Sequence, residues 1–336
     1  MSILVQPFGK NANLYTLENK NGTRLAVTDI GACVVSLVFR GVDVALGWVD
    51  PATYFRGDLY FGATVGRSCN RIADGSFTIN GVRYQMAKND GENNLHSGPD
   101  GYETRLWRIA SLSEDAVTFF LDSPDGDQGF PGRLRLWASY TLTGDDEIRI
   151  GYRGIADADT VVNITNHTYF NLNGHGSGDI HGHTLRLHAG RFTPAGPGLI
   201  PTGEIVPVAG TAFDFTTAHT IGRDIAADDP RLVSAGGYDH NFLIDGEGFR
   251  PAAELTGDRT GITLTVETDR PAMQLYTGNF IAGVKGKGGA VYEKRGAVCL
   301  ETQQVPNAVN ESAFPSPLVK AGEEYAARTV WKLKKD

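Results

Sequence analysis

Cysteine is scarce in this sequence, which has Cys33, Cys69 and Cys299 among 336 residues. Three dispersed cysteines cannot make a regular disulfide framework, so we expect reduced thiols. The first residues have no basic segment and apolar core of a signal peptide, and no apolar run approaches the roughly 20 residues that cross a membrane. We therefore expect a cytoplasmic protein that has no membrane partner.

An excess of positive charge is also missing. The chain has 31 Lys and Arg against 39 Asp and Glu, a formal net charge of −8. The densest basic run, "WKLKKD" at the end of the sequence, is short and is typical of a solvated tail. An acidic chain of this kind is not expected to bind nucleic acid, and its charge suits a neutral ligand.

Helical periodicity is rare, whereas alternation of apolar and polar residues recurs along the whole chain. The clearest case is "FTINGVRYQM", residues 77–86, in which Asn80-Gly81 separates two alternating runs. This dipeptide between such runs predicts a β-hairpin with a type I′ turn. The 42 glycines, with many Tyr, Phe, Val and Thr, also favour strands joined by tight turns.

The expected fold is all-β: a large antiparallel β-sandwich or barrel with few short helices. No alternation of strands and helices indicates a parallel sheet. We expect at most a turn of helix in 51–58 and one short helix in 221–235, interrupted by Pro230. Since no linker divides the sequence, residues 1–336 are expected to form a single domain.

Polar residues that bear useful chemistry gather in four segments. "GRSCNRIADG" holds Asn70 and Arg71, and "NNLHSG" holds His96. An arginine offers a fixed fork of donors for an oxygen-rich ligand, but for this segment taken alone we favour a structural arginine bonded to loop carbonyls. A lone histidine after an apolar residue is more often structural than catalytic.

The other two segments point more strongly to a site. "TNHTYFNLNG", residues 165–174, places His167, Thr168 and Tyr169 where an ordinary strand would bury fewer hydrogen-bonding groups. In "CLETQQVPNAVN", Glu301 follows a strongly apolar run, so burial should raise its pKa and make it a better base. "GGYDHNFLID" similarly presents Asp239 just before an apolar strand.

Motifs for metals and phosphates are weak. His181, His183 and His188 lack a matching Cys or carboxylate spacing for zinc, and we interpret them as loop and strand-surface residues. "VKGKGGA" has neither the Walker A nor the dinucleotide spacing, and G-x-S-x-G is missing. None of these segments therefore carries a recognisable metal-binding or phosphate-binding motif.

The segments together resemble one family, aldose 1-epimerase or mutarotase. The similarity lies in "GRSCNRIADGSFTINGVRY", "NNLHSG", "NITNHTYFNLNG", "GLIPTGEIVPVAGTAFDF", "GYDHNFLID", "QLYTGNF", "CLETQQVPNAVN" and "SPLVKAGEEY". They occur in the family's order and span nearly the whole chain, and "NHTYFNL", "YTGNF" and "LETQ" are the most specific.

The resemblance implies a galactose mutarotase-like β-sandwich that interconverts the α and β anomers of free aldohexoses such as galactose and glucose. It implies His167 as general acid and Glu301 as general base, with no cofactor or metal. The substrate-binding residues would then be Asn70, Arg71, His96, Thr168, Tyr169, Asp239 and Gln274. The expected partner is a free monosaccharide, and the expected oligomeric state is a monomer or homodimer.

Three other functions are compatible with the same fold. A relative could act on ketoses, modified aldoses or sugar phosphates, although only Arg71 and Arg67 are obvious phosphate ligands. A glycoside hydrolase would use Asp239 and Glu301 as its carboxylate pair. A non-catalytic sugar-binding module would not need both His167 and Glu301. Two departures from the family, Ser97 and Asn307, are expected to bear on sugar preference rather than on activity.

Overall fold

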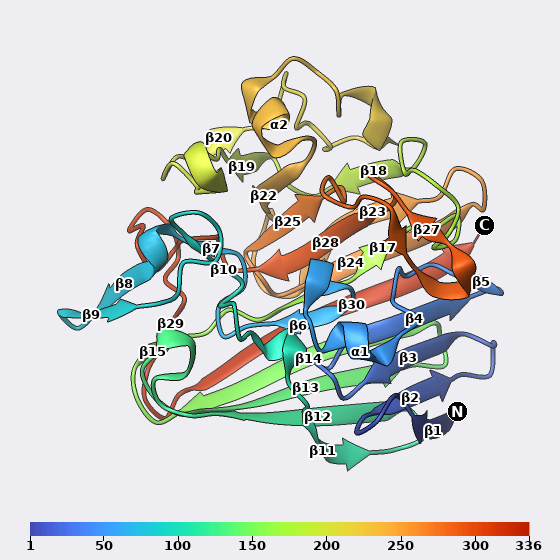
Figure 1. Cartoon of the computed structure of the whole chain (residues 1–336). Coiled ribbons are helices and arrows are strands. Elements are labelled where there is room, and N and C mark those ends of the chain that lie inside the picture. Colours follow the sequence, from blue (N-terminus) through green and yellow to red (C-terminus); the bar gives the residue numbers. More distant parts are fainter. Residues whose placement is uncertain (336) are drawn as a thin grey trace.

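The computed structural model describes residues 1–335, and the strands of every ladder in this range run antiparallel (Figure 1). The largest sheet has nine strands in the order β11 (Arg108–Leu112), β12 (Ala116–Ser123), β13 (Leu134–Leu142), β14 (Glu147–Ala156), β30 (Glu324–Lys335), β24 (Ile262–Thr268), β23 (Arg250–Thr256), β18 (Thr184–Leu187) and β21 (His219–Thr220). A second sheet has six strands in the order β17 (Tyr169–Phe170), β28 (Val298–Gln303), β25 (Ala272–Tyr276), β22 (Asp239–Leu243), β19 (Arg191–Thr193) and β20 (Val206–Pro207).

A third sheet of five strands follows chain order, as β1 (Ser2–Pro7), β2 (Asn13–Glu18), β3 (Arg24–Thr28), β4 (Val34–Phe39) and β5 (Val42–Asp43). The remaining strands form pairs: β6 (Ala63–Val65) with β16 (Thr165–His167), β7 (Arg71–Ile72) with β10 (Asn94–Leu95), β8 (Ser76–Ile79) with β9 (Val82–Gln85), β15 (Thr160–Val161) with β29 (Leu318–Val319), and β26 (Val284–Lys285) with β27 (Val291–Tyr292).

Helices are few and short, as expected. The α-helices are α1 (Pro51–Tyr54) and α2 (Pro230–Ala235), and single 3₁₀ turns are η1 (Asp58–Tyr60), η2 (Ala73–Gly75), η3 (Tyr102–Thr104), η4 (Asp127–Gly129), η5 (Pro197–Leu199), η6 (Ile221–Arg223) and η7 (Lys287–Gly289). Among residues 1–335, none of the helices has the length and apolar character needed to cross a bilayer.

The helix prediction near Pro230 was wrong in one respect. Pro230 begins α2 rather than interrupting a helix, because Asp229 caps the helix by accepting a hydrogen bond from the Arg231 N–H. Proline is well suited to the first helical position, where its missing N–H would have had no partner in the helix.

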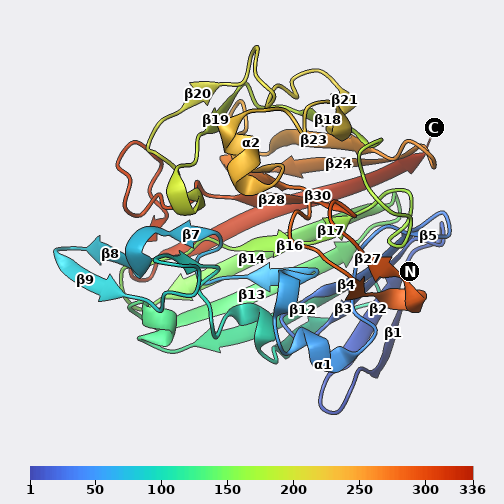
Figure 2. The ribbon, with the colours of Figure 1, turned by 45° about the horizontal axis from the view of Figure 1, so that its top comes forward.

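The predicted hairpin at 77–86 is confirmed. β8 and β9 pair across Asn80 and Gly81, which have φ angles of 51° and 79°. Positive φ at both central residues is the requirement of a type I′ turn. The hairpin projects from the side of the molecule in both views (Figure 1 and Figure 2).

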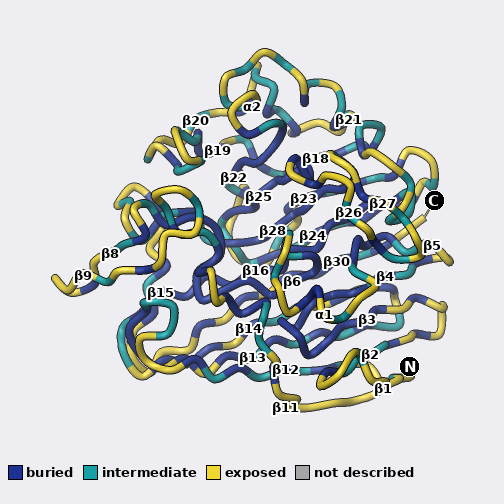
Figure 3. Tube along the Cα trace, viewed as in Figure 1, coloured by how far each residue is buried: buried dark blue, intermediate teal, exposed yellow. Residues whose placement is uncertain are grey.

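The strands of the nine-stranded sheet show the alternation that the sequence predicts. Along β12, β13 and β14, buried residues alternate with more exposed ones (Figure 3). Successive side chains of a strand point to opposite faces, so one face of this sheet supplies the core.

One hydrophobic cluster takes side chains from all three large sheets. Leu25 from the five-stranded sheet, Leu136 and Trp331 from the nine-stranded sheet, and Leu275 from the six-stranded sheet belong to it. The all-β antiparallel sandwich is therefore confirmed. We propose that the chain is a single domain, because the same cluster extends from Tyr15 to Leu333.

The six-stranded sheet is covered on both faces. All six residues of β28 are buried. Val298 and Leu300 belong to the main core, whereas Cys299 belongs to a separate cluster on the other side. Because side chains alternate along a strand, Glu301 shares the second face with Cys299. This second face is where the polar candidates of β22, β25 and β28 meet.

Candidate active site

A pocket with a volume of about 160 Å³ lies over the second face of the six-stranded sheet. It is lined by Leu59, Tyr60, Asn70, Arg71, Leu95, His96, His167, Tyr169, Asp239, Gln274, Tyr276, Phe280 and Glu301. Eight of the nine residues predicted from the sequence are in this set, although the chain separates the first from the last by more than two thirds of its length. The fold therefore brings four distant polar segments together.

The pairing register of the strands sets the floor of the pocket. Gln274 of β25 lies directly opposite Glu301 of β28, and Tyr276 lies opposite Cys299. On the other side of β25, Asp239 of β22 pairs with Tyr276. Directly opposed residues have Cβ atoms about 4.5–5.5 Å apart, which places these side chains in one cluster.

Two loops form the rim beside this floor. β7 pairs with β10 so that Arg71 lies opposite Leu95, and His96 follows directly. The backbone N–H of His96 donates to the Asn70 carbonyl at 3.1 Å, and the Asn70 N–H donates to Nδ1 of His96 at 3.1 Å. These two bonds lock the loops together and fix the orientation of the His96 ring.

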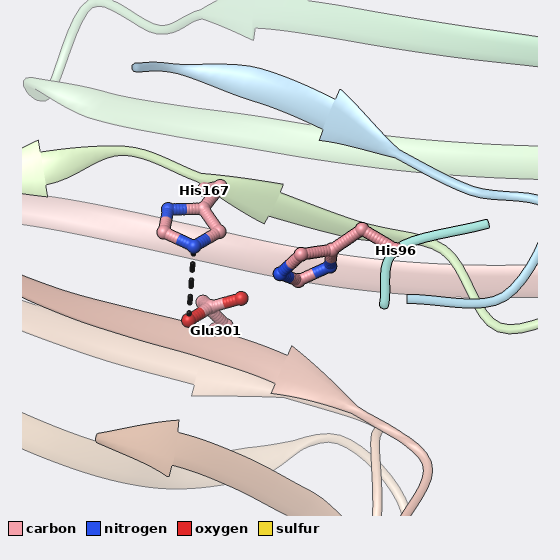
Figure 4. Close-up of side chains that lie close together, drawn as sticks. All are labelled: His96, His167 and Glu301. Atoms are coloured by element: carbon pink, nitrogen blue, oxygen red, sulfur yellow. Dashed lines mark ion pairs between the residues drawn. The ribbon is translucent and has the colours of Figure 1, made fainter. Parts of the chain in front are cut away.

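Within the pocket, His167 and Glu301 point toward one another, with His96 beside them (Figure 4). Nε2 of His167 lies 3.6 Å from Oε1 of Glu301, and both side chains are almost completely buried. The second carboxyl oxygen of Glu301, Oε2, is buried and has no hydrogen-bond partner among residues 1–335. A buried oxygen without a partner loses hydration without compensation, so this atom is available to a ligand hydroxyl.

Burial shifts the two groups in opposite directions. It raises the pKa of Glu301 well above the ordinary glutamate value, and the negative charge of Asp239 adds to this while the Arg71 guanidinium opposes it. Burial lowers the pKa of His167 to about 4. Burial disfavours the charged form of each group, so the pair holds one proton over a wide range of pH.

The three side chains His96, His167 and Glu301 also lie close enough to be considered as metal ligands, with one candidate atom of each within 4.8 Å of the others. The His96 tautomer argues against this role. Because Nδ1 of His96 accepts the Asn70 N–H, the proton of the neutral ring is on Nε2, which then has no lone pair for a metal. Burial holds the pKa of His96 well below its usual value, so the ring stays neutral. His96 is therefore a hydrogen-bond donor.

A chain of hydrogen bonds orients the ligand-binding groups. Gln303 Nε2 donates to Gln274 Oε1 at 3.3 Å, and Gln274 Nε2 donates to Asp239 Oδ1 at 2.6 Å. Arg71 donates through Nε to Asp90 at 2.8 Å, and its Nη1 lies 3.9 Å from Asp239 Oδ2. Asp239 therefore presents a fixed, partly neutralised carboxylate, which suits the binding of hydroxyl groups.

Of the aromatic residues that line the pocket, the sequence-based interpretation named Tyr169 but missed Tyr60, Tyr276 and Phe280. Tyr60 and Tyr169 each stack with the His167 ring, and their ring centroids lie 5.7 and 5.0 Å from its centroid. Tyr276 meets it edge-on at 6.2 Å, and Phe280 lies at the mouth. Tyr276 and Phe280 are in "QLYTGNF", where alternation with Gln274 could have indicated Tyr276. Tyr60 lies in an irregular turn that gives no such signal.

One predicted site residue does not line the pocket. The Thr168 side chain is buried and donates to Oδ1 of Asn166 at 2.6 Å. Because neighbours along an extended chain point to opposite faces, placing His167 and Tyr169 in the pocket turns Thr168 away from it. The assignment of Thr168 to sugar binding is corrected on this ground.

The interpretation of His183 as a surface residue was also wrong. His183 is fully buried, and its Nε2 accepts the backbone N–H of Leu172 at 3.0 Å. It satisfies a buried backbone donor, which is a structural role. His181 and His188 retain part of their exposure, as expected.

The residues that depart from the family pattern have structural roles. The Ser97 hydroxyl accepts from the Ser68 N–H and donates to the Ser68 carbonyl, both at 2.9 Å. Oδ1 of Asn307 accepts the Ala73 N–H at 3.0 Å.

Arg67, which the sequence offered as a phosphate ligand, is fully buried and donates to loop carbonyls such as those of Pro131 and Gly132. Like Ser97 and Asn307, it does not line the pocket.

A buried acid–base pair, surrounded by oriented polar groups and aromatic rings on a β-sandwich, defines an enzyme that moves protons on a hydroxylated ligand. Comparison with known proteins gives the family. Residues 13–332 match the family model described as Aldose 1-epimerase.

Individual relatives agree with this match. The chain is 45% identical over 294 residues to a galactose mutarotase of Sus scrofa, which covers 87% of this chain and 84% of the relative. It is 39% identical over 336 residues to an aldose 1-epimerase of Haemophilus influenzae, covering 98% and 97%. A solved structure of a GalM/aldose epimerase homologue from C. elegans superimposes with a TM-score of 0.90 at 27% identity, covering 96% of this chain and 99% of that one.

The chain belongs to the aldose 1-epimerase family. It is accordingly an isomerase, whose reaction is epimerisation at C1 of an aldose.

Proposed function

We propose that this enzyme interconverts the α and β anomers of free aldohexoses such as galactose and glucose, with His167 and Glu301 as its acid–base pair. The observation that carries the proposal is the buried contact between Nε2 of His167 and Oε1 of Glu301, with Oε2 of Glu301 left for the substrate. Anomer exchange needs one group that takes a proton from the C1 hydroxyl and another that gives a proton to the ring oxygen. Both of these oxygens are bonded to C1.

The reaction begins when the pair is in its charged form, with the shared proton on Nε2 of His167. Glu301 takes the proton of the C1 hydroxyl while His167 gives its proton to the ring oxygen. The bond between C1 and the ring oxygen breaks, and an open-chain aldehyde forms. The pair still holds one proton, which is now on Glu301 and came from the C1 hydroxyl, while the proton of the histidine is on the former ring oxygen.

The aldehyde turns about the C1–C2 bond and closes on its other face, with the two groups exchanging roles. Burial makes the charged form of the pair unfavourable, so the histidine is a stronger acid and the glutamate a stronger base than in water. Each positioned group is expected to contribute roughly 10² to 10⁴-fold to the rate, which corresponds to about 3 to 5.5 kcal/mol.

The surrounding residues bind the sugar and stabilise charge. The Nε2–H of His96 and the guanidinium of Arg71 are placed to stabilise developing negative charge on the ring oxygen. Asp239, held by Gln274, accepts hydrogen bonds from sugar hydroxyls. Asn70 and Tyr169 complete the polar lining, and Tyr60 offers an aromatic face to the C–H groups of the ring.

The geometry favours this reaction over the rival functions. A sugar phosphate is not supported, because Arg67 lies outside the pocket, and the one arginine among the lining residues, Arg71, has its charge partly neutralised by Asp90 and Asp239. A glycoside hydrolase would use Asp239 as its second carboxyl group, yet Asp239 is bound by Gln274. A passive sugar-binding module has no use for a buried His167–Glu301 contact.

The proposal includes the setting of the enzyme. Its partner is a free monosaccharide, and the acid–base steps use only protons that the residues and the sugar exchange. Three free, buried cysteines support a location in the cytoplasm, in hexose and galactose metabolism. We place the oligomeric state at monomer or homodimer.

Optical rotation tests the function directly. Freshly dissolved α-D-galactose and α-D-glucose should reach their equilibrium rotations faster with the protein than without it, and the end points should be identical. The sugar with the greater acceleration is the preferred substrate. Traces no faster than the spontaneous reaction for both sugars would overturn the proposal and direct attention to ketoses and glycosides.

The pH dependence of the rate should show the lowered pKa of His167. The pair needs one proton, so activity should hold across neutral pH and fall near pH 4, where neutral His167 takes up a second proton. It should fall again above the raised pKa of Glu301, where the pair loses its only proton. Initial rates, corrected for spontaneous mutarotation, give the profile, and circular dichroism at each pH checks folding. An acid limb at the ordinary histidine value of about 6.5 would contradict the assignment.

A further inference from the structure

The proposed acid has a second nitrogen that the mechanism does not use, Nδ1 of His167. It lies 3.5 Å from Sγ of Cys299. Cys299 is fully buried and lies two positions before Glu301 on β28. Cys299 faces the pocket side of β28 together with Glu301, because the intervening Leu300 points into the main core.

The shared proton decides what Nδ1 must carry. When the proton is on Glu301, Nε2 of His167 presents its lone pair, so the proton of the neutral ring is on Nδ1. When the proton is on Nε2, the ring is a cation and Nδ1 is protonated as well. Nδ1 therefore keeps its hydrogen in both states of the pair and needs an acceptor throughout the reaction.

The side-chain atom that faces Nδ1 is Sγ of Cys299. The backbone carbonyl of His167 opposes the effect of burial on the pKa of the ring, but this carbonyl already accepts the Gly62 N–H at 3.1 Å. Burial, and then the charges of Glu301 and Asp239, raise the pKa of the Cys299 thiol well above its usual value, so the sulfur is a neutral, weak acceptor.

Within residues 1–335, the groups packed around the ring supply no alternative charged partner for Nδ1. The titratable neighbours are Glu301, which faces Nε2, and the neutral side chains His96, Tyr60, Tyr169, Tyr276 and Cys299. A carboxylate at Nδ1 would stabilise the imidazolium and weaken it as an acid. A thiol fixes the tautomer and leaves the acid strong.

The geometry points to Cys299 as a positioning residue. Its sulfur accepts the Nδ1–H of His167 and so keeps Nε2 directed at Glu301 for proton transfer. This inference rests on the proposed function. It concerns the protonation state of Nδ1 of His167, which can be measured in the protein without any sugar.

Nitrogen-15 NMR of histidine-labelled protein at neutral pH tests the tautomer directly. The expected result for His167, assigned by its absence in His167→Gln, is a protonated Nδ1 and an unprotonated Nε2. A neutral ring protonated on Nε2 instead would overturn the inference, and it would do so without bearing on whether the enzyme accelerates mutarotation.

Substitutions then test the effect on catalysis. Cys299→Ala should increase the population of the Nε2–H tautomer and lower kcat roughly tenfold, a part of the 10² to 10⁴-fold that a positioned acid supplies, with KM little changed. Cys299→Ser keeps an acceptor and should restore both the tautomer and most of kcat. Cys33→Ala, at a buried cysteine outside the pocket, controls for loss of packing.

Cys299→Asp provides the opposite change. A carboxylate at this position should raise the pKa of His167 and move the acid limb of the rate profile to higher pH. An unchanged tautomer and an unchanged kcat in Cys299→Ala, or an equal loss in Cys33→Ala, would show that Cys299 serves packing alone and would overturn the inference.

Discussion

Replacing Glu301 with glutamine is expected to lower kcat by roughly 10² to 10⁴-fold, the contribution of a positioned general base. The amide keeps the size of the side chain but cannot take the proton of the C1 hydroxyl. KM should change little, because binding depends on the groups around Asp239 rather than on this proton transfer. Polarimetry with α-D-galactose measures both constants.

The same substitution should not weaken the fold. The raised pKa of Glu301 means that the unfolded carboxyl loses its proton near pH 4.3 while the folded one keeps it. The free energy of unfolding therefore falls as the pH rises from the pKa of the unfolded carboxyl to the raised pKa of the folded one, by up to about 1.4 kcal/mol per pH unit. Glu301→Gln removes this loss.

Glu103 provides a matched control for Glu301. It is buried, its pKa is raised to about 7 by burial, and it does not line the pocket. Glu103→Gln should change the pH dependence of unfolding in the same direction and leave kcat near the wild-type value. Full activity in Glu301→Gln would remove Glu301 from the mechanism, whatever the stability data show.

Replacing His167 with glutamine is expected to have an effect of the same order, roughly 10² to 10⁴-fold in kcat. Glutamine can still donate a hydrogen bond to the ring oxygen, but it cannot transfer a proton. His183→Gln is the matched control, because His183 is also buried with a pKa lowered to about 4 and lies outside the pocket.

The double variant of Glu301 and His167 distinguishes a coupled pair from two independent groups. Residues that act as a unit are not additive, so the double variant should be little slower than the slower single variant. Losses that multiply would contradict a proton shared between Oε1 and Nε2. Rates of all three variants should be compared with the spontaneous reaction.

Local features of the fold could be predicted from the sequence. Alternation along β12 to β14 and the Asn80-Gly81 turn act over a few residues, and both were correct. Strand order was not predictable, because β14 pairs with β30, with Glu147 opposite Lys332, and nothing local encodes a pairing between segments so far apart in the sequence.

The site shows the same division between local and long-range information. Glu301 could be found because a carboxylate in an apolar run is unusual wherever it occurs. His183 was misjudged because its polar sequence neighbours hide the burial that the surrounding strands create. Tyr60 was missed because its place in the pocket depends on an irregular turn and not on a strand face.

The double burial of β28 has a consequence for how this enzyme can change. Val298 and Leu300 pack into the main core, whereas Cys299 and Glu301 lie on the face that carries the pocket. A substitution in this short strand can therefore affect both stability and catalysis. Adaptation to a new sugar is more accessible through the loops that carry the rim of the pocket. Random variation followed by selection should therefore concentrate successful changes in those loops and leave the strand unaltered.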